Sequence, residues 1–210
     1  MRVRPISTDV LVEELADLLT SRESDSYLRV AFDGAPAAGP GELADALVGP
    51  LRARGRPAMR IDTADFLRPA SLRLEFGRND PDSYYQGWFD EAGLAREVLD
   101  PAGPGGSGRV LARLWDATAD RAARESYTEL SAGTILLVSG PLLLGGGLAF
   151  DVTVHLEMSA AALLRRTPAE DAWTLPAFSR YAEEVGPASF ADVVLRVDDP
   201  RRPAMVLERS

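Results

Sequence analysis

The sequence has no cysteine, no lysine and no long apolar run, and each absence excludes a class of function. Without cysteine, the chain can form no disulfide, no thiolate nucleophile and no zinc–thiolate site. All 23 basic residues are arginines, so no reaction step can use an ε-amino group. No apolar run reaches the ~20 residues that span a bilayer, and Met1–Pro5 leads into no secretory hydrophobic segment. We therefore expect a cytoplasmic protein with no membrane partner.

Basic charge is scarce as well. The 32 acidic residues outnumber the basic ones and give a net charge of −9, which disfavours non-specific binding to nucleic acid. A small anion can still be held in a local pocket. The hydrophobic content of 46% over 210 residues fits one folded domain with a substantial core.

Apolar segments and helical patterns alternate along the chain. The predicted strands are 28–32, 58–62, 109–115 as an edge strand, 134–138, 150–156 and 192–197. The predicted helices are one capped by Thr8 and ending near Arg22, then 42–54 with a kink at Pro50, 91–99, 159–166 and 175–185. Residues 63–89 are expected to be loop with short helical pieces, and 101–108 a flexible connection. This order predicts an α/β fold, a mostly parallel sheet covered on both faces.

A glycine-rich segment joins the first buried strand to the next helix. Its residues are Gly34, Ala35, Pro36, Ala37, Ala38, Gly39, Pro40 and Gly41. Gly34 and Gly39 have the spacing of the phosphate-loop pattern G-x-x-x-x-G-K-[ST], in which backbone N–H groups and a helix N-terminus face an anion. The lysine position is Pro40, which also lacks an N–H, and the hydroxyl position is Gly41, which removes the usual magnesium ligand. A simple turn with Pro40 opening the helix explains the same residues.

From Val30 onward, the order of segments resembles the uridine kinase and phosphoribulokinase group of P-loop kinases. The resemblance covers nearly all of the chain after the first helix. The segments that carry it are Val30–Gly34, Ile61–Pro69, Asp82–Asp90, Leu136–Pro141, Leu163–Arg166 and Tyr181–Asp192. It implies a three-layer, nucleoside kinase-like P-loop NTPase fold in a single domain over 1–210. Within that domain it implies an N-terminal helix at 1–24, an acceptor-side insertion at 63–130 and a lid region at 165–176.

The departures from this family fall on its chemistry. The resemblance places the general base at Ala64, with Asp65 beside it as a substitute, and a magnesium-holding acid at Ser139. Lysine, hydroxyl, base and acid are therefore all altered. Losing one such group typically lowers a rate by about 10²–10³, and losing four leaves little catalysis. We assign no catalytic residue, metal or cofactor.

Several residues are candidates for binding a substrate. They are Asp65, Arg68, Tyr85, Trp88, Asp116 and Arg121, with Arg165 and Arg166 in the lid. Asp116 and Arg121 follow from the resemblance of Trp115–Asp116 to a pair near the nucleoside in that family. Tyr84, Tyr85, Trp88 and Phe89 form either a wall for a planar ligand or ordinary core, and the lid arginines are either a phosphate clamp or solvated charges. The lone His155 is expected to be a packing or surface histidine.

Three functions remain open. The leading one is a catalytically inactive, kinase-like protein that binds a nucleoside, nucleotide or small anion in a regulatory or accessory role. The second is an active nucleoside kinase using ATP and magnesium, with Arg165 or Arg166 replacing the lysine and Asp65 the base. The third is an interaction scaffold, as a homodimer, without a small ligand. Magnesium-dependent ATP binding distinguishes the second from the others, and nucleoside binding without ATP distinguishes the first from the third.

Overall fold

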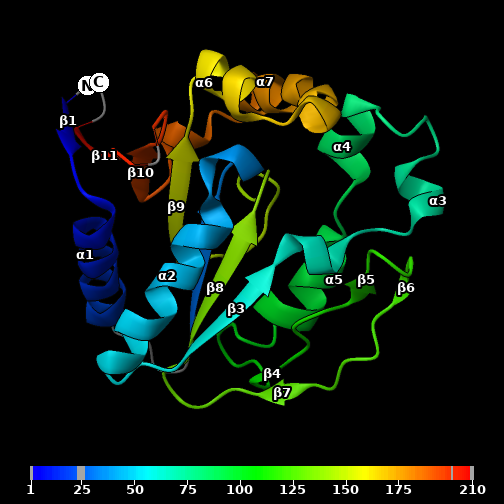
Figure 1. The fold of residues 1–210 in the computed structure, drawn as a ribbon. Coiled ribbons are helices and arrows are strands. Elements are labelled where there is room, and N and C mark those ends of the chain that lie inside the picture. Colours follow the sequence, from blue (N-terminus) through cyan, green and yellow to red (C-terminus); the bar gives the residue numbers. More distant parts are fainter. Residues whose placement is uncertain (1, 23–26, 200, 209–210) are drawn as a thin grey trace.

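The computed structural model describes residues 2–22, 27–199 and 201–208. A seven-stranded sheet forms its centre, with helices on both faces (Figure 1). In their order across the sheet the strands are β1 (Arg2–Pro5), β11 (Ala204–Glu208), β10 (Val193–Arg196), β9 (Val152–Glu157), β2 (Leu28–Asp33), β8 (Ile135–Gly140) and β3 (Ala58–Asp62).

The five strands from β10 to β3 are parallel, which confirms the mostly parallel sheet. β2 and β8 are buried at every position, as continuous apolar runs predict for a sheet covered on both faces. β1 and β11 add an antiparallel edge that the sequence analysis did not predict. These two short strands come from opposite ends of the chain, so no local pattern indicates that they pair.

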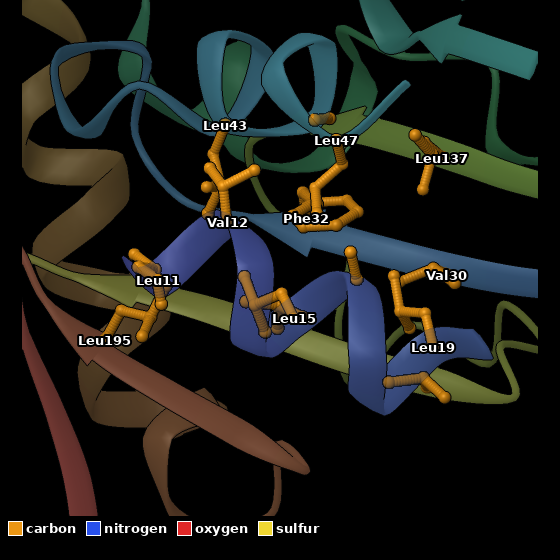
Figure 2. Packing of buried hydrophobic residues seen from close by; sticks show 14 of the residues in the cluster. Leu11, Val12, Leu15, Leu19, Val30, Phe32, Leu43, Leu47, Leu137 and Leu195 are labelled. Atoms are coloured by element: carbon orange, nitrogen blue, oxygen red, sulfur yellow. The ribbon is translucent and has the colours of Figure 1, made fainter. Parts of the chain in front are cut away.

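Helices α1 (Thr8–Ser21) and α2 (Pro40–Ala53) cover one face of the sheet. Figure 2 shows Leu11, Leu15 and Leu19 of α1, spaced four residues apart, pointing toward the sheet and α2. The predicted cap was off by one residue, because Ser7 Oγ, not Thr8, accepts the N–H of Val10 at 3.4 Å. α2 begins at Pro40 rather than residue 42, and Pro50 lies inside it.

The opposite face is covered by α5 (Glu91–Leu94), the π-helical turn Ala95–Leu99 and α7 (Leu175–Glu184). α6 (Ala160–Arg166) and α7 lie above the carboxyl ends of the strands in Figure 1. There α7 contacts α4 (Pro81–Gly87), which follows α3 (Ala70–Arg73). Four 3₁₀ turns complete the helices: Pro36–Ala38, Thr63–Phe66, Ala169–Thr174 and Pro187–Ser189.

The predicted edge strand at 109–115 is wrong. These residues belong to two small ladders outside the central sheet, β4 (Arg109–Val110) with β7 (Thr128–Glu129) and β5 (Trp115–Asp116) with β6 (Arg121–Ala122). Half-buried alternation looks the same in an edge strand and in a small ladder, so the pattern did not distinguish them. The preceding glycine-rich segment forms turns, in which Gly108 N donates to Pro101 O at 2.8 Å. Within the described ranges, no helix has the length and hydropathy to cross a membrane.

Candidate functional site

The glycine-rich loop lies at the carboxyl end of β2, as predicted. The N–H of Gly34 donates to Gly140 O at the end of β8, 3.2 Å away. From β2 the chain runs through α2 to β3, whereas from β9 it runs through α6 and α7 to β10, on the other side of the sheet. Ligands of open parallel sheets bind where neighbouring connections diverge in this way. The loop therefore opens onto the crevice where this topology places a ligand.

The loop uses much of its hydrogen-bonding capacity on itself. Ala38 N donates to Ala35 O at 2.8 Å, and Gly39 N donates to Pro36 O at 3.1 Å. Pro36 and Pro40 have no N–H to offer. Gly39 has φ +77°, a left-handed conformation that explains the glycine. Fewer backbone donors remain for an anion than in a loop whose amides all point inward.

Glu42, in the first turn of α2, brings a negative charge to the loop. A Cβ built on Gly39 would lie 3.4 Å from Glu42 Oε2, so the carboxylate folds back over the loop. A carboxylate at a helix N-terminus is stabilised by the helix dipole. Here it stands beside the place an anion would take, in a loop whose motif normally carries a lysine. The loop therefore has a negative side chain beside it, whereas the motif carries a positive one.

We expect Glu42→Gln to strengthen the binding of inorganic phosphate by about 2- to 10-fold, because it removes this like charge and leaves the helix N-terminus free. Glu183→Gln, on the exposed surface of α7, is the matched control and should leave phosphate affinity unchanged. Titration calorimetry of both variants measures the difference. Weaker or equal phosphate binding by Glu42→Gln would contradict this role for Glu42.

A cleft of about 360 Å³ opens beside the loop and gathers the altered positions. Its lining includes Pro40, Gly41, Ala64 and Ser139, the positions at which lysine, hydroxyl, base and acid were expected. Tyr84, Trp88 and Phe89 form the side contributed by α4 and the residues after it. Sequence positions far apart along the chain thus meet around one space.

Arg60, on β3, lies directly beneath this cleft. Its Nη2 donates to Ser139 Oγ at 2.9 Å, and its Nη1 donates to Leu137 O at 2.8 Å. A Cβ built on Gly41 would lie 3.7 Å from Arg60 Nη2. The guanidinium therefore fills the corner between positions 41 and 139. The sequence analysis did not assign it a role; the available signal was an arginine within the short apolar segment predicted as the strand 58–62.

This corner does not fit the magnesium ion that kinase chemistry of this fold uses. Of the two altered ligand positions, Gly41 offers no side-chain oxygen and Ser139 Oγ accepts a hydrogen bond from Arg60. Asp62 lines the cleft, yet its Oδ1 accepts the N–H of Ala64 at 2.8 Å. Over the described part of the chain, no group of three histidine or acidic side chains is placed to hold a metal. The Arg60 guanidinium also occupies the space of this corner, and its charge is paired with Asp45, whose Oδ1 lies 2.6 Å from Arg60 Nε.

Asp65, the candidate substitute base, does not line the cleft. Its carboxylate lies 3.0 Å from Arg113 Nε, on the side of the β5–β6 ladder. Burial raises the pKa of Asp65, and the nearby guanidinium opposes that rise. Thr63, which precedes Ala64, lines the cleft. The acidic residue closest to Ala64 in sequence that lines the cleft is Asp62.

The other candidate residues are spread around the cleft rather than gathered in it. Arg68 lines a separate hollow next to α3 and α4. Tyr85 lies outside the cleft, with the guanidinium of Arg180 stacked 4.4 Å from its ring centre. Asp116 accepts the N–H groups of the turn that follows it, and Arg121 is exposed on β6.

The two lid arginines are exposed on the last turn of α6. Arg166 lines a hollow of about 350 Å³ on the other side of the loop, together with Pro36–Gly39 and Leu195. The pKa of Asp198 is lowered mainly by the hydrogen bond from the backbone N–H of Ser159, and the charge of Arg165 makes a smaller contribution in the same direction. Of the pair, Arg166 is therefore the one beside the loop.

The aromatic residues pack in the core, and three of them, Tyr84, Trp88 and Phe89, also line the cleft. Tyr84 is buried among Trp88, Trp173 and Phe178, with ring centres 5.5–5.8 Å apart, so the cluster packs α4 against α7. Trp88 and Phe89 also line the cleft. Arg73 lies over the Trp88 ring at 5.1 Å. Trp88 is the candidate that the structure places both in the core cluster and on the cleft.

A buried polar cluster behind the loop was missed by sequence reasoning. Asp33, the last residue of β2, is 0% exposed and accepts the backbone N–H of Leu143 at 2.9 Å. His155 Nδ1 lies 2.7 Å from Asp33 Oδ2, and the hydroxyl of Tyr181 donates to the same oxygen at 3.1 Å. His155 is a buried, packed histidine, as expected, but its partner is a carboxylate. A charged residue directly after the apolar residues Val30–Phe32 of β2 was the missed signal.

No family model and no curated protein matches the sequence. Solved structures do match it. A possible uridine kinase from Bacillus stearothermophilus superposes with a TM-score of 0.71 at 19% identity, over 89% of this chain and 97% of that chain. A fructose transport system kinase from Silicibacter sp. TM1040 gives 0.57 at 21% identity, over 84% of this chain and 88% of that chain. The YGR205w protein gives 0.56 at 14% identity, over 96% of this chain and 99% of that chain. The predicted fold is thus confirmed: an α/β, P-loop kinase-like fold with a mostly parallel sheet.

Proposed function

We propose that this chain is a non-catalytic binding protein on a P-loop kinase-like fold, holding a nucleoside, nucleotide or other small anion in a regulatory or accessory role. The observation that carries the proposal is the position of Arg60, whose guanidinium fills the corner where a metal-holding hydroxyl and acid are absent. Phosphoryl transfer depends on placing metal and cationic groups around the phosphates. A site that replaces the metal by a structural arginine, and the lysine by proline, lacks that arrangement.

The lining of the cleft favours the uncharged member of these ligand classes. Glu42 and Asp62 line it, and none of the described arginines does; the guanidinium of Arg60 beneath it is paired with Asp45 at 2.6 Å. A triphosphate would add like charge to these carboxylates without a metal to neutralise it. Aromatic edges from Trp88 and Phe89 suit the planar ring of a base. We therefore propose a nucleoside, or a compound of that shape, as the ligand of this cleft.

The alternative of a working nucleoside kinase is favoured by one observation. Arg166 lines the hollow beside the phosphate loop, from which a guanidinium can approach a bound phosphate. The alternative still lacks a base, because Ala64 carries no carboxylate and Asp65 is paired with Arg113. Catalysis would also require a magnesium ion. Arg60 lies next to Gly41 and Ser139, the two positions that would have to hold it.

We expect ATP with magnesium to bind weakly or not at all at physiological concentration, whereas uridine or a related nucleoside binds without magnesium. Calorimetry of a nucleoside panel and of ATP, with and without magnesium, measures both. Trp88→Ala should weaken nucleoside binding about 5- to 100-fold, the usual range for losing one base–aromatic contact. Phe190→Ala, at an exposed aromatic residue outside the cleft, is the matched control.

A micromolar ATP site that depends on magnesium would contradict the proposal. Nucleoside affinity that falls equally in Trp88→Ala and Phe190→Ala would place the ligand elsewhere.

A further inference from the structure

A second cavity, of about 310 Å³, lies behind the phosphate loop on the side of α6 and α7. It is bounded by Gly34–Ala35, the carboxyl end of β9 and the turn at 186–189. Its walls are largely apolar and include Leu142, Leu156, Met158, Leu163 and Phe178. A volume of this size is at the lower end of small-molecule sites, which are mainly apolar with a few convergent polar groups.

Polar side chains reach this cavity from His155, Glu157, Tyr181 and Ser189, and the tautomer of His155 is set by Asp33. Both oxygens of the buried Asp33 carboxyl group already accept hydrogen bonds, Oδ1 from the N–H of Leu143 and Oδ2 from the hydroxyl of Tyr181, and His155 Nδ1 lies 2.7 Å from Oδ2. Nδ1 of His155 must therefore carry a hydrogen. In the neutral ring Nε2 is then an acceptor. None of the described residues forms a hydrogen bond with Nε2, and the ring lines the cavity.

The position of the pair is fixed by the sheet. Asp33 and His155 are direct partners in the register of β2 and β9, so their side chains leave the same face of the sheet. Tyr181 of α7 covers that face: its hydroxyl donates to Asp33 and accepts the N–H of Leu144 at 3.0 Å. β2 and β9 are also the neighbouring strands whose connections diverge. The cavity is thus built on rigid elements at the ligand-binding point of this topology.

The charges around the cavity select the kind of ligand. Glu157 lines it, none of the described arginines does, and the chain has no lysine. An anionic ligand would meet Glu157, whose carboxylate is paired with Arg196 at 3.5 Å, and the nearby Asp33, with no cationic side chain in the cavity wall. A neutral ligand with a donor hydrogen would satisfy Nε2.

We propose that this cavity is a second binding site, separate from the cleft at Pro40 and Gly41, for a compact and mainly apolar molecule of about one ring. Its hydroxyl or amino group donates a hydrogen bond to Nε2 of His155. The site does not depend on phosphate recognition and goes beyond the proposed function.

The only histidine in the chain makes the test direct, because ¹⁵N-histidine labelling gives a single imidazole signal pair. At pH 8 we expect Nδ1 to be protonated and Nε2 not. Phenol should then shift the Nε2 resonance in a saturable way. Anisole, which has the same ring without the donor, should bind roughly 3- to 10-fold more weakly, the usual value of one hydrogen bond, and benzoate should bind more weakly than phenol.

Two tryptophan variants locate the binding. Leu163→Trp adds a large ring from the cavity wall and should abolish the phenol response, whereas Leu164→Trp, at a neighbouring position that is 67% exposed, should retain it. The proposal is overturned if Nε2 is protonated at pH 8, if phenol causes no saturable shift, if anisole or benzoate binds as tightly as phenol, or if Leu163→Trp responds like Leu164→Trp. Loss of nucleoside binding in the cleft has no bearing on this outcome.

Discussion

Replacing Asp33 with alanine is expected to lower the free energy of unfolding by about 3–5 kcal/mol, because three buried groups lose their acceptor and each unsatisfied buried donor costs about 1–3 kcal/mol. The carboxylate is fully buried and accepts hydrogen bonds from three elements: the segment after β8, β9 and α7. Its removal leaves the Leu143 N–H and the Tyr181 hydroxyl short of a buried acceptor and frees the His155 ring.

Chemical denaturation of the variant against the unmodified protein measures this loss. Asp17→Ala is the matched control. Asp17, like Asp33, has a hydrogen-bonding partner, here Arg54 at 2.8 Å, but its side chain is 71% exposed. We expect Asp17→Ala to change stability by no more than about 0.5 kcal/mol. Asp33→Asn, which keeps one acceptor oxygen, should lose less than Asp33→Ala. A loss below about 1 kcal/mol in Asp33→Ala would show that the cluster contributes little to the fold.

The second large effect concerns restoring catalysis. Pro40→Lys with Gly41→Ser is expected to recover nucleotide affinity without turnover, because Ala64 and Ser139 still lack the base and the acid. The serine fits sterically, since the nearest atoms to a Cβ on Gly41 lie at 3.7–3.9 Å, an ordinary contact distance. Adding Ala64→Asp and Ser139→Glu is necessary for any phosphorylation of a nucleoside.

Those four changes are not expected to suffice, because of Arg60. Its Nη2 lies 2.9 Å from Ser139 Oγ, so a glutamate at 139 would form an ion pair with the guanidinium instead of holding magnesium. A fifth change, Arg60→Met, should therefore be required before product appears. Nucleoside phosphorylation by the four- and five-change variants, each checked for folding by circular dichroism, makes the comparison. Equal turnover with and without Arg60 would show that the arginine does not block the metal corner.

The central strands and their helices could be predicted from the sequence because their signals are local. The apolar run at 134–138 and the four-residue spacing of Leu11, Leu15 and Leu19 need no knowledge of distant residues. The edge pair β1 and β11 depends on contacts between the two ends of the chain, which no local pattern encodes. The same limit explains the error at 109–115, where the partner strand decides between an edge strand and a separate ladder.

The same distinction between local signals and long-range contacts applies to the candidate site. Position in a motif predicted that Pro40, Gly41, Ala64 and Ser139 belong together, and they line one cleft. Motif position could not show which way neighbouring side chains point. Asp65 pairs with Arg113, Arg60 reaches under the loop from the next strand but one, and Glu42 folds back over Gly39. The direction of each of these side chains depends on residues that are distant in sequence or on the local turn of the backbone.

The most direct test of the absence of phosphoryl-transfer chemistry is an assay of the unmodified protein with γ-labelled ATP, magnesium and a panel of nucleosides. With no lysine or hydroxyl in the loop, no base at 64 and Arg60 in the metal corner, we expect no phosphorylated product above the protein-free background. Turnover at an ordinary kinase rate, on the order of 1–100 per second, would contradict the proposal, and Arg166 and Asp65 would then be the residues to replace first.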